Sequence, residues 1–454
     1  MSKKLLTATA LTALALAGSN AFVTPAYAQE AGVSARISKL EQEIALLKRQ
    51  QEVDQEKSAS AAEKNANVEF GKKGLKITSP DKKYELSLKG YYQLDSRQFL
   101  NDNKSTGRDE IISRRLRPIL EGRAGDASFR LMPDFAGNSS SPRVFDAHVD
   151  YKLDDAVQFR LGKFKPPVGL ERLQSATDID FIERGHANNL APNRDLGFMI
   201  YGNAIPDLLE YQIGVFNGGP DLGNTDNDAD DKKDLVARIF ATPFHNSDIV
   251  PLQGFGAGIA GTIGDREGSA TNTILGTYKT PGQQDFFKYR SDTYASGEQW
   301  RLYPQAYWYN GSFGAIGEYA ISNQDVRRGA VRDTLQHDAW NVALSYVLTG
   351  EDASFKGGVK PAEDVSFETG GIGAWEVVAR AGATDVDNKT FAVFADPNAA
   401  ASKAQSYGVG LNWYVNENFK LATDYDFTSF DGGATGGRDR PNEQALFSRA
   451  QFRF

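Results

Sequence analysis

Most of the chain alternates between apolar and polar residues with a period of two, which is the pattern of β-strands whose two faces meet different surroundings. The last ten residues, ALFSRAQFRF (445–454), show this alternation clearly. One face is mostly apolar and includes Phe452 and Phe454, whereas the other face carries Arg449 and Arg453. A soluble sheet would turn the apolar face towards a core, and a membrane barrel would turn it towards lipid.

The alternation predicts sixteen strands from Tyr84 to the end of the chain. They are expected at residues 84–94, 111–124, 128–136, 143–153, 156–163, 195–202, 208–216, 234–243, 255–264, 300–309, 313–322, 339–348, 373–383, 405–415, 418–428 and 445–454. The 44 glycines and 27 phenylalanines of the chain also favour a protein of many strands and turns.

The connections alternate between short and long. Tight turns are expected at 125–127, 154–155, 310–312 and 416–418, and longer polar loops at 164–194, 217–233, 265–299, 323–338 and 429–444. Short turns at one end and long loops at the other are typical of outer-membrane barrels. The connection 349–372 breaks this rule, because it should be a short turn and has about two dozen residues.

One face of the predicted strands is apolar throughout, as a lipid-facing surface requires. Three examples are Leu235, Ala237, Ile239 and Ala241; Trp340, Val342, Leu344, Tyr346 and Leu348; and Tyr407, Val409, Leu411, Trp413 and Val415. After the first 28 residues, no segment has the roughly 20 consecutive apolar residues of a spanning helix. Only helices and closed barrels satisfy their backbone hydrogen bonds in lipid. The prediction is therefore an all-β, sixteen-stranded antiparallel transmembrane barrel rather than a soluble sandwich.

Three segments precede the barrel, which is expected at 70–454. Residues 1–28 have two lysines, an apolar run and the small-residue pattern AYA, which together indicate a secretory signal peptide. Residues 29–57 are predicted to be a periplasmic coiled-coil segment, and the polar residues 58–69 a linker. The coiled-coil seam consists of Val33, Ile37, Leu40, Ile44 and Leu47. The alternative for this segment is a single amphipathic helix that lies on its own domain.

Composition excludes several classes of function. The chain has no cysteine, so disulfides, thiol catalysis and cysteine zinc sites are excluded. Its formal net charge of −8 argues against general nucleic-acid binding. The four histidines have no metal-ligand spacing, and no nucleophile and base are arranged for catalysis. We expect no cofactor and no enzymatic activity.

The phase of the strands places arginines in the lumen. On strand 111–124, Leu116, Pro118 and Leu120 face lipid, so Arg115, Arg117 and Arg123 face inward. A charge on the lipid side would cost roughly 2–4 kcal/mol at the bilayer midplane. The same phase turns inward Arg130, Arg160, Arg238, Arg380, Arg449 and Arg453. Guanidinium groups favour oxyanions, so these residues are candidates for anion passage. The alternative is that they only pair with lumen acids such as Asp134, Asp146, Glu318 and Asp424.

Two loops are candidates for parts of a permeation path. The loop 164–194 is long enough to narrow the lumen if it folds inward, and it carries Lys165, Arg172, Arg184 and Arg194 beside several acids. The loop 276–290 sets Lys279, Lys288 and Arg290 among aromatic residues, and it is a candidate mouth for an anion or sugar-phosphate path.

Four stretches resemble the phosphate-selective porin O/P family: RRLRPILEG (114–122), VQFRLGKFKPPVGLERL (157–173), GIGAWEVVAR (371–380) and GLNWYVNENFKLATDY (410–425). The resemblance covers residues 68–454. It implies a homotrimeric sixteen-stranded porin that passes phosphate or related oxyanions. The last residue, Phe454, is similar to the terminal signal of outer-membrane barrels, which implies the barrel assembly machinery as a partner.

The resemblance also carries individual residues over to this chain. Arg114 and Arg115 match an arginine pair at a family anion site, and Asp146 matches an acidic residue near the family's constriction. Arg172 falls where phosphate-selective members carry lysine, and Arg238 matches an arginine of a middle strand. Tyr91 departs from the pattern, because it stands where those members have arginine.

The expected protein is a porin in the outer membrane of a Gram-negative bacterium, reached by Sec-type export. It lies among outer-membrane lipid and lipopolysaccharide and lets phosphate or other small anions diffuse passively through a basic-lined pore. One alternative is a general porin, or one selective for an organic anion or a sugar. Another is an exported β-rich carbohydrate-binding protein or enzyme.

Overall fold

The computed structural model describes residues 27–100, 107–137, 142–228 and 230–454, and it divides into two compact units, Met1–Asn65 and Ala66–Phe454. The first unit contains the helix α1 (Tyr27–Lys64), so residues 58–64 of the predicted linker are helical. The signal peptide predicted at 1–28 lies almost entirely outside the described residues. None of the described helices is long and apolar enough to cross a membrane.

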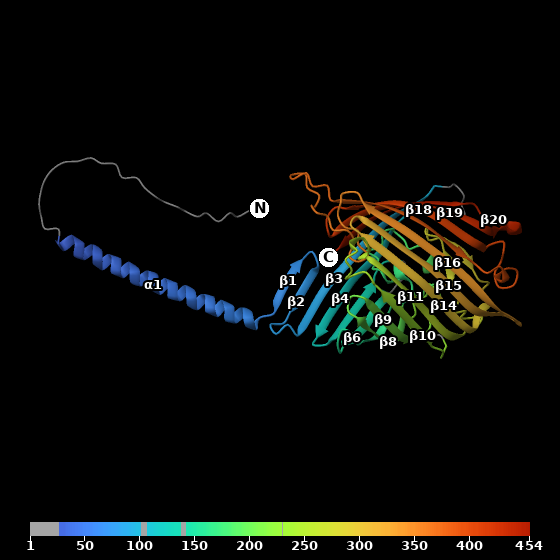
Figure 1. The fold of residues 1–454 in the computed structure, drawn as a ribbon, viewed down its shortest axis with the longest axis horizontal. Coiled ribbons are helices and arrows are strands. Elements are labelled where there is room, and N and C mark those ends of the chain that lie inside the picture. Colours follow the sequence, from blue (N-terminus) through green and yellow to red (C-terminus); the bar gives the residue numbers. More distant parts are fainter. Residues whose placement is uncertain (1–26, 101–106, 138–141, 229) are drawn as a thin grey trace. The chain divides into compact units, whose positions relative to one another are not determined.

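The second unit is a barrel of sixteen antiparallel strands (Figure 1). The strands of the first half are β3 (Tyr84–Phe99), β4 (Glu110–Ala124), β5 (Ala127–Asp134), β6 (Arg143–Lys152), β7 (Gln158–Phe164), β8 (Asp195–Ile205), β9 (Leu209–Phe216), β10 (Asp234–Ala241) and β11 (Phe255–Glu267). Those of the second half are β14 (Thr293–Asn310), β15 (Phe313–Arg328), β16 (Val331–Val347), β17 (Ala374–Asp385), β18 (Ala401–Tyr414), β19 (Phe419–Ala434) and β21 (Glu443–Arg453).

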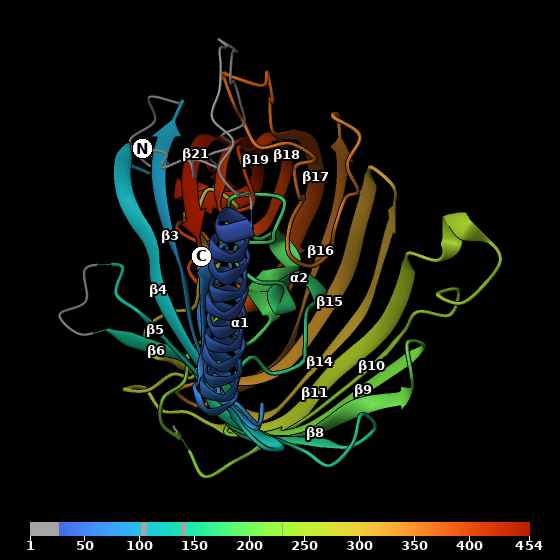
Figure 2. The same ribbon diagram turned by 90° about the vertical axis from the view of Figure 1, so that its left-hand side faces the viewer.

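The last strand closes the barrel against the first. Strand β21 pairs with β3 from Ala445 opposite Phe99 to Arg453 opposite Tyr91. The hairpin of β1 (Asn67–Gly71) and β2 (Gly74–Thr78) continues the same edge of β3, because β2 pairs with residues 85–88. Figure 2 shows the resulting ring of strands around α2 (Leu170–Leu173). The predicted fold class is confirmed.

The two faces of the wall differ as the alternation predicts. On β10, exposed Leu235 and Ile239 alternate with buried Val236, Arg238 and Phe240. The residues exposed on the outer face are apolar, and those that face the lumen include the charged ones. The rings of Trp375 and Trp413 stack at 5.0 Å near the end where the short turns lie, as an interfacial aromatic girdle requires.

Some predicted loops are wrong. The segment 323–338 is not a long loop, because β15 and β16 run through it and are joined by the residues 329–330 alone. Likewise, β19 and β21 extend into 429–444 and leave only a short connection, which includes η4 (Thr435–Gly437) and β20 (Arg438–Asp439). Strands that continue beyond the apolar band meet water on their outer face too, so the apolar–polar contrast that marks a strand disappears from the sequence.

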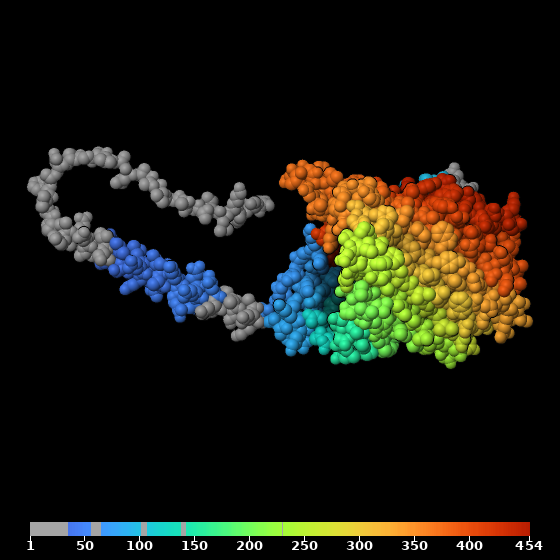
Figure 3. All heavy atoms as spheres, in the orientation of Figure 1, coloured from blue at the N-terminus to red at the C-terminus, as the bar shows by residue number. Residues whose placement is uncertain are grey.

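Other short elements lie in the connections. They are η1 (His186–Leu190), η2 (Val250–Leu252), η3 (Asn388–Thr390) and the hairpin of β12 (Thr277–Lys279) and β13 (Asp285–Lys288). The end of the barrel with the short turns is called here the turn end, and the opposite end the loop end. The connection between β16 and β17 lies at the turn end. It projects beyond the strands (orange in Figure 3), and Phe367 in it is fully exposed.

Deleting residues 450–454 should abolish accumulation of the barrel in the outer membrane. The deletion removes the β21–β3 pairing from Ala450 opposite Leu94 onwards and leaves an unpaired edge, which lipid cannot satisfy. Immunoblots of outer-membrane fractions measure the effect. Deleting residues 33–57 is the matched control and should leave barrel levels unchanged, because these residues lie outside the barrel unit. Normal levels of the carboxy-terminal deletion would contradict the closing role of β21.

Candidate functional site

The loop between β7 and β8, residues 165–194, folds into the barrel and crosses its lumen. Most of its side chains are buried, including Phe181, Ile182 and Leu190. It is held by hydrogen bonds to strands around the wall. On the wall, Gln93, Asn412 and Gln451 donate to the carbonyl groups of Ala176, Asp180 and Thr177, respectively. Glu318 accepts from Leu170 N. The hydroxyl groups of Thr384 and Ser406 bind the two ring nitrogens of His186. Folded outward, this loop would have been a solvated lid; the structure shows it in the inward position, where it narrows the lumen.

Glu183 is the central anchor of this loop. Its carboxylate accepts hydrogen bonds from Arg114 at 2.5 and 3.1 Å, from Arg97 at 3.2 Å and from Arg449 at 3.4 Å. Arg115 Nη2 lies 3.5 Å from the same carboxylate. Burial raises the pKa of Glu183, but the surrounding guanidinium groups outweigh burial and hold the pKa well below its usual value. The carboxylate is therefore charged at neutral pH.

A bulge explains how two consecutive arginines reach Glu183. Side chains of neighbouring strand residues normally point to opposite faces, so Arg114 would face lipid if Arg115 faces the lumen. The pairing of β3 with β4 shifts here, since Gln93 lies opposite Arg115 and Leu94 lies opposite Ser113. Arg114 is thus an extra residue on β4, and the bulge turns its side chain inward. Both arginines bind the loop rather than stand free in the lumen.

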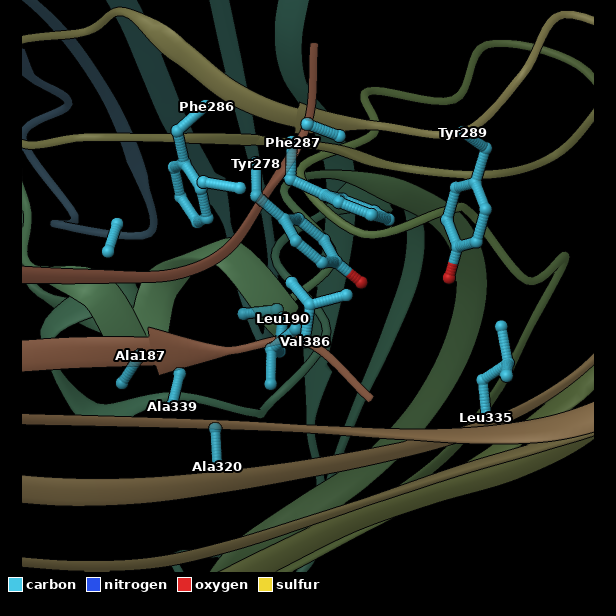
Figure 4. Packing of buried hydrophobic residues seen from close by; sticks show 14 of the residues in the cluster. Ala187, Leu190, Tyr278, Phe286, Phe287, Tyr289, Ala320, Leu335, Ala339 and Val386 are labelled. Carbon is cyan, nitrogen blue, oxygen red and sulfur yellow. The ribbon is translucent and has the colours of Figure 1, made fainter. Parts of the chain in front are cut away.

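The hairpin β12–β13 fills another part of the lumen. Its rings Tyr278, Phe286 and Phe287 are buried against Leu190 of the inward loop and Val386 (Figure 4). The wall beside them presents small residues, Ala320 and Ala339 among them. The inward loop and the hairpin together pack against strands of the second half of the barrel.

An open cavity of about 320 Å³ remains between the inward loop and the strands of the first half, and we call it the basic cavity. Its lining includes six cationic side chains and one carboxylate. The cations are Arg117, Arg130, Arg160, Lys165, Arg184 and Arg194, and the carboxylate is Asp146. Tyr91, Met132, His148 and Gln212 complete much of the remaining wall. The structure thus brings together Arg117, Arg130, Asp146 and Arg160, as their phase predicts.

The wall arginines of the basic cavity are paired with acids. Arg117 Nε donates to Asp134 at 2.7 Å, and Arg160 binds Asp150 through two bonds of 2.6 and 3.1 Å. Arg130 binds Glu121 and also Asp146, and Asp146 in turn accepts from Arg194 at 3.1 Å. These pairs fix the positions of the guanidinium groups and reduce their net charge.

Three cations of the inward loop have no such partner. Lys165 Nζ donates to the carbonyl groups of Leu173 and Gln174, at 3.2 and 2.8 Å. Arg184 donates to the carbonyl groups of Glu171 and Gln174, at 2.9 and 2.8 Å. Arg172 binds Asn193 Oδ1 and Asn188 O. Within the described parts of the chain, no carboxylate lies within ion-pair distance of any of the three. Their charges are therefore not neutralised by a contacting acid.

The remaining predicted site residues lie elsewhere. Arg123 lies near the turn after β4 and is largely exposed, with Nη2 bound to Lys82 O. Arg238 lies towards the turn end and binds Gln305. Lys279 lies beside Asp285 on the hairpin. Lys288 and Arg290 line a separate open cavity of about 850 Å³ at the loop end.

His148 and the anchoring role of Glu183 are not among the features predicted from the sequence. His148 is buried on β6, lines the basic cavity and lies 3.6 Å from Asp150, and its Nδ1 has no hydrogen-bond partner. The available signal was the alternation along the strand, because His148 lies two residues after Asp146 and therefore on the same inward face. No sequence signal singles out Glu183 among the acids of its loop. In the described residues, no group of three or more His, Cys, Asp or Glu could hold a metal ion.

Comparisons with known proteins agree with this architecture. The family model described as phosphate-selective porin O and P matches residues 86–454. Porin O of Pseudomonas aeruginosa is 28% identical over 391 residues, which are 78% of this chain and 85% of that protein.

Solved structures of other porins share the fold. The anion-selective porin from Comamonas acidovorans is 12% identical and superimposes with a TM-score of 0.50, over 82% of this chain and all of that chain (100%). The trimer form of OmpT from Vibrio cholerae is 10% identical with a TM-score of 0.51, over 82% of this chain and 99% of that chain.

Replacing Glu183 by glutamine should release the inward loop from the wall. Removing one partner of a buried ion pair costs roughly 3–5 kcal/mol, because the remaining charges are left uncompensated. We expect a larger and noisier single-channel conductance, and unfolding at a lower temperature in heat-modifiable gel migration. Glu298→Gln is the matched control, since Glu298 is exposed and has no ion-pair partner among the described residues. An unchanged conductance in Glu183→Gln would show that the loop is held without this carboxylate.

Proposed function

Because the chain belongs to the phosphate-selective porin O and P family, we propose that small anions, phosphate among them, diffuse passively through its basic cavity. Family membership and the likeness to Porin O make the chain a porin of the outer membrane of a Gram-negative bacterium, and a channel rather than an enzyme. In barrels of this class the short turns face the periplasm. The long loop therefore narrows the path between the outside and the periplasm.

The observation that carries the anion bias is the set of unneutralised cations on the inward loop. Lys165 and Arg184 line the basic cavity and bond only to carbonyl groups. A narrow lumen between protein walls screens charge less than bulk water does, so these cations attract anions and repel cations. The paired arginines on the wall add directed N–H groups, which suit the oxygen atoms of phosphate. An overall negative chain thus has a locally positive path.

Passage also requires that the anion is not held too tightly. A site of fully unpaired guanidinium groups would retain phosphate, and a site of fully neutralised pairs would not attract it. The basic cavity combines both kinds of residue, because Arg117 and Arg160 are paired on the wall and Lys165 and Arg184 stand opposite on the loop without acids. This arrangement favours transient binding followed by release.

We also propose that the protein is a homotrimer whose α1 helices associate through their apolar seam. Ile37, Leu40, Ile44 and Leu47 are between 50% and 66% exposed, so within the described part of the helical unit this stripe is not covered. A seam of this length is too short to hold three chains alone. Chains already joined through their barrels would place the helices at a high effective concentration, at which a short seam is sufficient.

Removing the two unneutralised cations of the basic cavity should lower anion selectivity. A unit charge at about 4 Å contributes roughly 1 kcal/mol even at the dielectric constant of bulk water. We therefore expect Lys165→Met with Arg184→Met to reduce the anion-to-cation permeability ratio about fivefold or more, and to weaken the block of chloride current by phosphate. Reversal potentials in a potassium chloride gradient measure the ratio. Arg123→Met is the matched control and should retain the wild-type ratio.

The pH dependence of the anion-to-cation permeability ratio provides a second measurement on Lys165. Burial lowers the pKa of Lys165 well below its usual value, and the charges of Arg194 and Arg184 lower it further. The ammonium charge is therefore lost as pH rises, at a pH below that of an ordinary lysine. Chloride selectivity should fall as pH rises through this lowered pKa in the wild type and stay level over the same range in Lys165→Arg. A wild type that prefers cations at neutral pH would overturn the proposed function.

Replacing Ile37, Leu40, Ile44 and Leu47 by serine should weaken the trimer without affecting the barrel. Each change removes an exposed apolar side chain from the seam and touches no residue of the barrel unit. We expect normal outer-membrane levels and a trimer that dissociates at a temperature several degrees lower on seminative gels. The same number of serines away from the seam, at Lys39, Gln42, Arg49 and Glu52, is the control. Equal dissociation temperatures for wild type and seam variant would leave α1 as a spacer.

A further inference from the structure

A second cavity, of about 660 Å³, lies on the turn-end side of the inward loop, and we call it the aromatic cavity. It shares Leu173, Ser175 and Gln212 with the basic cavity, so the two cavities are neighbours. Its lining also includes the rings of Phe240, Tyr307 and Phe355, the cations Arg238 and Lys356, and the carboxylates Asp178, Asp207 and Glu210. The proposed function assigns no role to this combination of aromatic rings and cations.

Three rings form a continuous stack beside this cavity. Tyr307 on β14 stacks on Phe240 of β10, with ring centres 5.2 Å apart, and on Phe355, with ring centres 4.7 Å apart. Tyr307 and Phe355 are only partly buried, so their edges are accessible to a solute. Leu173 adds an aliphatic surface from the inward loop. The stack thus provides an apolar surface beside the cavity. An inorganic ion has no apolar group that could bind to this surface.

The position of Phe355 is fixed by the unusually long connection between β16 and β17. Its carbonyl group accepts a hydrogen bond from Gln174 at 3.0 Å. Two residues further, Gly357 N donates to Asp178 at 2.9 Å, and Gly357 O accepts from Arg453 at 2.7 Å. The connection is therefore tied both to the inward loop and to the closing strand. A two-residue turn at this place could not bring a ring into the lumen.

Two cations lie at the same cavity. The guanidinium group of Arg238 lies 4.5 Å from the centre of the Phe240 ring, and its nearest carboxylate, on Glu210, is 3.7 Å away. Lys356 is exposed beside Phe355, and no acid of the described chain lies within ion-pair distance of it. The cationic groups thus adjoin the two ends of the ring stack. A ligand that matches this surface has an anionic group beside a flat apolar group.

We propose that the aromatic cavity is a binding site for organic phosphate monoesters that carry a ring, with the phosphate at Arg238 or Lys356 and the ring against Tyr307 and Phe355. This inference rests on the proposed function, because a ligand in the aromatic cavity blocks the chloride current only if that current passes through the lumen beside the inward loop. Contact of the two apolar surfaces removes both from water and adds to the attraction of the charges. Inorganic phosphate gains only the attraction of the charges.

Block of the chloride current in single-channel recordings tests the proposal. The probes are phenyl phosphate, methyl phosphate, inorganic phosphate and benzyl alcohol, each added to the turn-end side. For the wild type we expect phenyl phosphate to block at concentrations about tenfold lower than methyl phosphate, and benzyl alcohol not to block at these concentrations. Equal potency of the two esters would overturn the proposal, and so would block by benzyl alcohol at the concentration effective for phenyl phosphate.

Two variants locate the site. In Phe355→Ala the ratio of the two blocking concentrations should fall to about one, whereas in Phe367→Ala, which changes an exposed ring of the same connection, it should stay at the wild-type value. Lys356→Gln keeps the rings and should weaken block by both esters in parallel. A preference for phenyl phosphate that survives Phe355→Ala would overturn the proposal. Wild-type channels blocked by phenyl phosphate but not by inorganic phosphate would contradict the proposed function and leave the aromatic cavity supported.

Discussion

The buried carboxylate of Glu183 determines what kind of channel this barrel is. A barrel of sixteen strands without an inward loop would enclose a wide aqueous pore. Here the guanidinium groups of Arg97, Arg114, Arg115 and Arg449 hold one acid in the lumen, and the loop that carries it is held with it. Asp95 and Glu110 share these cations, because Asp95 binds Arg449 and both acids lie within ion-pair distance of Arg97. The network around Glu183 therefore narrows the lumen by holding the loop inside it.

The lumen is filled unevenly as a consequence. The inward loop and the hairpin β12–β13 pack against the second half of the barrel, where the wall offers small residues such as Ala320 and Ala339. The basic cavity remains beside the first half, where the wall offers Arg117, Arg130 and Arg160. Long charged side chains also lie on the filled side, where Arg301 and Arg380 are buried in pairs with Asp221 and Asp426. The filled side thus combines small residues with paired arginines.

The sequence predicts the barrel well because period-two alternation is imposed at every strand by lipid on one side and water on the other. It fails where that contrast ends, as at Arg328 and Val331, where strands continue in water on both faces. It also fails at Arg114, because a bulge reverses the phase without leaving a signal in the alternation. Contacts between distant segments, such as Glu183 with Arg449, depend on the path of a loop through space, and no local pattern encodes that path.

The closing of β21 on β3 has a consequence for the order of folding. Asp95 and Arg449 are bound across this junction although they are 354 positions apart in the sequence, so the pairing carries the largest loop-closure entropy of the wall and forms late. Glu183 contacts Arg97 on one side of the junction and Arg449 on the other. Because its anchor spans the junction, Glu183 can contact both strands only once β21 has paired with β3. The pairing that closes the wall therefore also completes the attachment of the inward loop.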